Sequence, residues 1–63
     1  MMQGPKKGSA IVYGQRCEIY ICQKSKTVWV VDGEYNGKSF IGSGRTQSAA
    51  VAQWIRIAER SDD

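Results

Sequence analysis

The chain has 63 residues, a formal net charge of +3, two cysteines and no histidine. This length allows one small domain, which buries only about 60% of the surface that the unfolded chain exposes. The residue types present exclude a disulfide framework and a four-ligand zinc site, so we expect neither a cofactor nor a bound metal.

Residues 1–10 contain one proline, two glycines and two lysines but no apolar run. We therefore predict a flexible basic N-terminal tail here, not a signal peptide or a membrane anchor. A single domain is expected over residues 11–60, followed by a polar tail over residues 61–63. Two cysteines without a disulfide framework favour reduced thiols in a cytoplasmic protein.

The first strand signals lie between residues 11 and 23. Residues 11–13, before Gly14, indicate either a short edge strand or only a lead-in. Residues 16–23 are predicted to form a strand, because apolar and polar side chains alternate along them. Cys17, Ile19 and Ile21 then face one side, and Glu18, Tyr20 and Cys22 the other. The two cysteines would lie about 16 Å apart on opposite faces, too far to form a disulfide bond.

Residues 24–26 are predicted to connect this strand to a second one that resumes at Thr27. Of two turn signals that follow, Asp32-Gly33 and Asn36-Gly37, we choose the latter, because both central positions of a type I′ turn need positive φ. This turn sets the register of the hairpin. The expected pairs are Tyr35 with Lys38, Gly33 with Phe40, Val31 with Gly42, and Asp32 with Ile41.

Residues 46–60 contain the apolar pattern of an amphipathic helix, with an apolar arc of roughly 160°. Thr46 is a suitable N-cap, and residues 42–44 end the third strand. Buried Trp54 is worth on the order of 4–6 kcal/mol, so we expect Trp54→Ala to unfold the chain. The predicted fold class is α+β, a three-stranded antiparallel sheet with one C-terminal helix packed on one face (β-β-β-α). The side chains expected to face the helix are Ile19, Ile21, Trp29, Val31 and Phe40.

Little in the sequence favours catalysis, and we do not expect an enzyme. There is no histidine base and no phosphate-binding Gly-Lys-Ser/Thr loop. Asp32 and Glu34 would lie about 7 Å apart on one strand face, but a sheet this small leaves no cleft around them. Residues 42–46 lead into a helix and are either an anion site with Arg45 or an ordinary turn.

Residues 17–58, and in particular the run NGKSFIGSGRTQSAAVA at 36–52, resemble the strand-strand-strand-helix portion of double-stranded RNA-binding domains. The resemblance implies that fold and contact with a polyanion. Two features depart from the family: Gln47 and Ser48 stand where it places basic residues, and its N-terminal helix is missing. The layout is also similar to AP2-type and integrase arm-binding domains, which read DNA with the sheet.

One hypothesis for function is a small nucleic-acid-binding module, with DNA or RNA as partner. Residues 1–31 carry five basic residues and one acidic (+4), whereas residues 32–63 carry four and five (−1). Arg56 and Arg60 on the helix offer a rival surface. The candidate contacts, besides the tail pair Lys6 and Lys7, are Arg16, Tyr20, Lys24, Lys26, Lys38 and Arg45.

The alternative hypothesis is association with a second copy or with another protein, without any membrane. The register leaves an apolar sheet face directed away from the helix. Its occupant would be the segment at residues 11–13, a second copy of the chain, or a different protein. The interaction-face residues expected are Tyr20, Val28, Val30 and Ile41, with Cys22 beside them.

Overall fold

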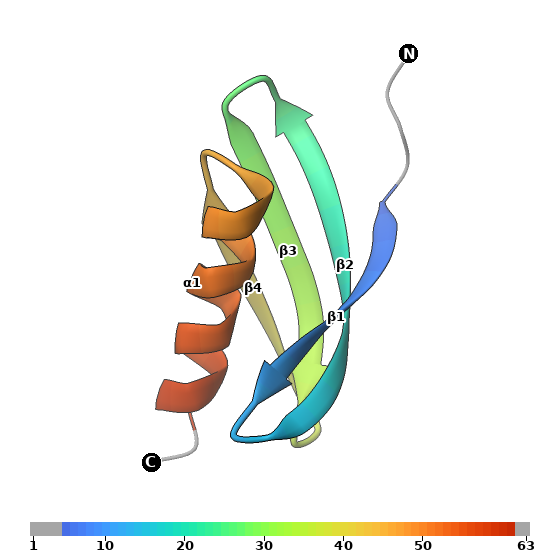
Figure 1. Cartoon of the computed structure of the whole chain (residues 1–63), viewed down its shortest axis with the longest axis vertical. Coiled ribbons are helices and arrows are strands. Elements are labelled where there is room, and N and C mark those ends of the chain that lie inside the picture. The colour runs from blue at the N-terminus through green and yellow to red at the C-terminus, as the bar shows by residue number, and fades with distance from the viewer. Residues whose placement is uncertain (1–4, 62–63) are drawn as a thin grey trace.

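The computed structural model describes residues 5–61, which form an antiparallel sheet of four strands followed by one helix (Figure 1). The elements are β1 Lys6–Val12, β2 Gln15–Ser25, β3 Val28–Tyr35, β4 Lys38–Gly44 and α1 Gln47–Arg60, and the strands lie side by side in sequence order. The α+β class, the antiparallel sheet and the C-terminal helix are confirmed. The prediction of three strands is wrong, because β1 adds a fourth.

Strand β1 replaces most of the predicted flexible tail. It pairs with β2 from Lys6 opposite Ile21 to Val12 opposite Gln15. The tail prediction is therefore wrong for residues 6–10, while residues 1–4 lie outside the described part of the chain. The Lys-Lys-Gly-Ser start of the strand has weak β propensity, but pairing with β2 and burial of Ala10 and Val12 outweigh it. Of the two alternatives for residues 11–13, the structure has the edge strand, since Ile11 and Val12 end β1 and Tyr13 lies in its turn.

The hairpin of β3 and β4 has the predicted turn and register. Asn36 and Gly37 have φ angles of 55° and 76°, and Tyr35 lies opposite Lys38. Tyr13 and Gly14, with φ of 49° and 78°, make a similar turn between β1 and β2. The connection of β2 to β3 is shorter than predicted, because the turn is at residues 26–27 and β2 continues to Ser25.

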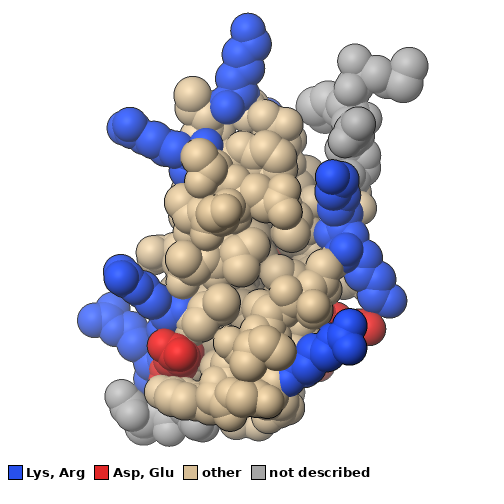
Figure 2. Space-filling view, viewed as in Figure 1, with Lys and Arg blue, Asp and Glu red and all other residues tan. Residues whose placement is uncertain are grey.

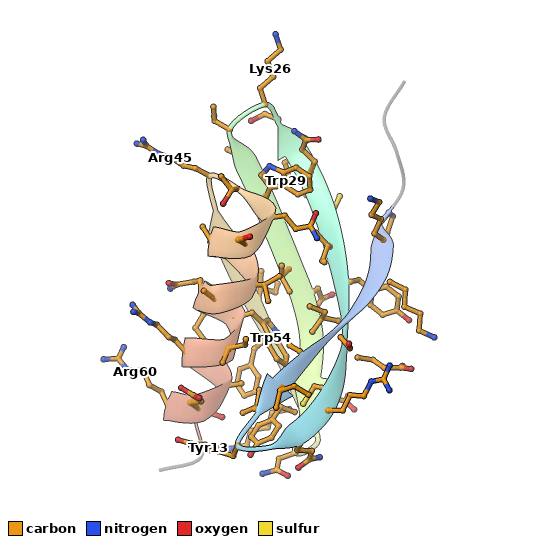
Figure 3. The ribbon with its side chains drawn as sticks, in the orientation of Figure 1. Tyr13, Lys26, Trp29, Arg45, Trp54 and Arg60 are labelled. Atoms are coloured by element: carbon orange, nitrogen blue, oxygen red, sulfur yellow. The ribbon has the colours of Figure 1, made fainter. Side chains whose placement is uncertain are left out.

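The helix covers the face of the sheet formed mainly by β3 and β4, with Trp54 at its centre (Figure 3). Trp54 is completely buried. The backbone of the helix at Trp54 lies very close to β4, since a Cβ on Gly42 would be 2.6 Å from the backbone nitrogen of Trp54. A glycine is therefore required at Gly42 for the helix to lie at this distance. The other fully buried large side chains are Ile19, Val12 and Val31, and Trp29 and Phe40 pack at the edge of this core.

Both ends of the helix are fixed by side chains. Thr46 is the N-cap, as predicted, and its hydroxyl oxygen accepts a hydrogen bond from the Ala49 N–H at 3.1 Å. Ser61 belongs to the predicted polar tail but is the C-cap, and its hydroxyl donates to the Ala58 carbonyl oxygen at 2.8 Å; residues 62–63 lie outside the described part. The Tyr13 hydroxyl donates to the Glu59 carbonyl oxygen at 3.3 Å, which joins the β1–β2 turn to the helix.

Candidate functional site

Four basic side chains gather toward the end of the molecule that carries the β2–β3 turn. Lys24 is the last residue but one of β2, Lys26 is in the turn, and Arg45 lies in the connection from β4 to the helix. Lys6 begins β1 and lies opposite Ile21, which itself lies opposite Val31. All four are exposed. Figure 3 shows Lys26 and Arg45 projecting from this same end, which we call the basic end (Lys6, Lys24, Lys26, Arg45).

The charges of the two halves of the structure differ. The half from the Ile21–Val31 pair to the β2–β3 turn comprises residues 6, 21–31 and 42–50, and these carry four basic residues and no acidic one (+4). The rest of the described chain, residues 5, 7–20, 32–41 and 51–61, carries five basic and four acidic residues (+1). Figure 2 shows the same division, with the visible acidic side chains confined to the lower half. The basic end is thus the region of positive potential.

Trp29 lies on the helix-facing side of the sheet just inside the basic end (Figure 3). It is half-buried, whereas Val31, two residues along β3 and on the same face, is buried. Its strand neighbours are Gly44, which has no side chain, and the exposed Gln23. Alternation along the strand correctly predicted its face. The sequence predicted Trp29 as a core residue, because alternation gives the face of a strand residue but not how far its side chain is buried.

The other predicted nucleic-acid contacts do not lie at the basic end. Arg16 is the second residue of β2 and Lys38 the first of β4, and both lie near the turns at the opposite end of the sheet. Arg16 and Tyr20 line a shallow hollow that also includes Glu18, Asp32 and Glu34. Three carboxylates there repel phosphate, so the structure separates the six predicted residues into two groups. The tail lysine Lys7 lies 3.5 Å from Glu18 in an exposed ion pair.

The sheet face away from the helix is partly apolar. Ile41 is 65% exposed, Tyr20 47% and Val28 41%, while Val30 and Cys22 are half-buried. These five are the residues predicted for this face, and the strand register places them on it. The segment at residues 11–13 does not fold over them, because it belongs to the edge strand β1 and its turn, where Ile11 is itself exposed. No described segment of the chain covers this face.

The remaining predicted features lie elsewhere. Arg56 and Arg60 border a hollow with Tyr13, Gln53 and Glu59 along the exposed side of the helix. Asp32 and Glu34 lie on one face, as predicted, within the open hollow of the outer sheet. Within residues 5–61 no group of three or more acidic or cysteine side chains is arranged to hold a metal ion. The described helix is too short and too polar to cross a bilayer.

No family model, no curated protein and no solved structure matches this chain. The resemblance to double-stranded RNA-binding domains therefore stays a prediction. The geometry of the described residues is what bears on function.

Proposed function

We propose that the protein is a small non-enzymatic module that binds nucleic acid through the basic end. The observation that supports this most is the separation of charge: +4 with no carboxylate on residues 6, 21–31 and 42–50, against +1 on the remaining described residues. Lysine and arginine side chains without nearby acids are what a phosphate backbone requires. The helix adds to this field, since its N-terminus points to the same end and its first turn contains no acid.

The charge count also limits the strength of binding. With four phosphate contacts, the affinity should fall by roughly 50- to 150-fold when salt rises from 50 to 200 mM, taking slopes of about 0.7 and 0.9 per contact for single strands and duplexes. A module of this kind binds weakly at physiological salt unless several copies or several contacts act together. Binding measurements should therefore begin at low salt.

Matched charge removal at the two ends tests the proposal. The variant Lys24→Gln/Lys26→Gln/Arg45→Gln removes three positive charges from the basic end, and Lys38→Gln/Arg56→Gln/Arg60→Gln removes three from elsewhere. Both variants have the same net charge, so an effect of net charge alone would lower the affinity of the two variants equally. We expect fluorescence anisotropy with labelled oligonucleotides to show a loss at least tenfold greater for the first variant. The proposal would be overturned if the two variants lost the same affinity for oligonucleotides. It would also be overturned if the wild-type protein bound polyglutamate as tightly as it binds the oligonucleotides.

A second candidate is protein association through the outer sheet face, favoured by the 65% exposure of Ile41. Exposed apolar side chains clustered on one sheet face usually mark a contact surface. Measuring mass by sedimentation across concentration tests self-association. Ile41→Glu should then dissociate the assembly, whereas Ala52→Glu on the exposed side of the helix should not. A mass that stays monomeric at every concentration excludes self-association.

A further inference from the structure

We infer that the ligand of the basic end is single-stranded nucleic acid and that Trp29 stacks on one of its bases. This inference rests on the proposed function and adds the class of nucleic acid. It starts from the position of one indole ring that packs at the edge of the core and is only half-buried. The core residues Trp54, Val31 and Ile19, by contrast, are completely buried.

The surroundings of Trp29 leave part of its ring accessible. On the β4 side its neighbour is Gly44, and a Cβ there would lie 2.6 Å from the Ala50 nitrogen. The first helical turn therefore lies directly over Gly44 and forms one boundary of the Trp29 site. On the β2 side the neighbour is Gln23, which is exposed. The half-buried ring thus lies between the first helical turn and the exposed Gln23.

Three cations lie at the same end of the molecule as this ring. Lys26 and Arg45 project from the end beyond it, as Figure 3 shows, and Lys6 lies on the same sheet face two pairs further along. An aromatic side chain among basic residues is the combination that proteins use for single strands, in which bases stack on the ring while phosphates meet the cations. In a duplex the bases are already stacked on each other and offer no free face to an indole. The geometry therefore favours unpaired bases.

Two measurements on the whole chain test this inference. Oligothymidylate should quench the fluorescence of the wild-type protein, and a duplex of equal length should not. The Trp29→Phe variant, which keeps only the buried Trp54, should lose this response. Trp29→Leu should lower the affinity for the single strand by about 5- to 150-fold, with Trp29→Phe intermediate, and should leave the affinity for the duplex unchanged.

The outcomes separate the two proposals. If the basic-end triple variant loses binding but duplex and single strand bind equally well to wild type and Trp29→Leu, the inference fails while nucleic-acid binding stands. If neither nucleic acid binds at low salt, both fail. Should Trp29→Leu not fold, as judged by circular dichroism, the wild-type and Trp29→Phe quenching measurements still decide.

Discussion

The indole N–H of Trp54 donates a hydrogen bond to the backbone carbonyl oxygen of Phe40 at 3.0 Å. The side chain at the centre of the helix is therefore tied to the strand beneath it, and its one polar atom is satisfied while the ring is fully buried. Gly33 provides the space, since a Cβ there would lie 2.8 Å from the Trp54 ring carbon Cζ2. Helix position and sheet packing are set by this contact.

Substitution of Trp54 should be far more costly than substitution of Trp29. Trp54→Ala should remove about 3–5 kcal/mol, comparable with the whole stability of a small domain, and so leave the chain unfolded. Trp54→Phe loses the hydrogen bond to Phe40 and part of the ring, and should cost about 1–3 kcal/mol. Urea unfolding followed by far-ultraviolet circular dichroism measures both. Trp29→Phe is the matched control; a loss as large as that of Trp54→Phe would contradict this account.

Gly42→Ala should be destabilising because the added methyl group would collide with the backbone of the helix at Trp54. The φ angle of Gly42 is not the reason. The added methyl group would lie 2.6 Å from the nitrogen and 2.8 Å from the Cα of Trp54, atoms that cannot move without shifting the helix. We expect a loss of about 1–3 kcal/mol or more in the free energy of unfolding. At Gly8 the nearest atom is the flexible Cδ1 of Ile21 at 3.3 Å. Gly8→Ala should therefore change stability much less, and similar losses in the two variants would argue against close helix packing.

Thr46→Ala should weaken the helix start. The Thr46 side chain satisfies the Ala49 N–H, which has no partner within the helix. Its removal is expected to cost about 1 kcal/mol, measured as a lower urea midpoint at unchanged slope. Ser48→Ala is the control, since Ser48 lies exposed in the first turn of the same helix. An equal effect of the two substitutions would show that the cap contributes nothing specific.

Local patterns predicted the centre of the fold well. Alternation placed Ile19, Ile21 and Val31 on the helix side, and Asn36-Gly37 set the register of the β3–β4 hairpin. Both features depend on neighbouring residues alone, because strand period and turn conformation are local properties. The helix, its N-cap and the burial of Trp54 followed from a 3.6-residue period in the same way.

The missed features depend on pairing between distant residues. Strand β1 has only Ala10, Ile11 and Val12 as apolar residues, and its Lys6-Lys7-Gly8-Ser9 half joins the sheet because β2 is long enough to pair with it. Gly14 was the local signal for the turn, and with it an edge strand at residues 11–13 was one of the two alternatives; the positive φ of Tyr13 is not one that a tyrosine indicates. The residues of the basic end were all among the predicted contacts, but their grouping apart from Arg16, Tyr20 and Lys38 was not predicted. Lys6, Lys26 and Arg45 come from three separate parts of the chain and lie at one end only in the folded sheet.

The two cysteines should differ in reactivity toward an alkylating or disulfide reagent. Cys17 is 5% exposed on the helix side of β2, and its Sγ donates to the Gln15 carbonyl oxygen at 3.6 Å. Cys22 is half-buried on the opposite face, and both are free, as their positions in the strand predicted. The reacting species is an accessible thiolate, and the reagent cannot reach a buried thiol. We therefore expect Cys22 to react first and Cys17 to react only when the chain unfolds. In Cys22→Ser the fast phase should vanish, and urea should restore a single rapid reaction from Cys17. Two equal rates in the folded wild type would show that Cys17 is not held in the core, and would place the β2 register in question.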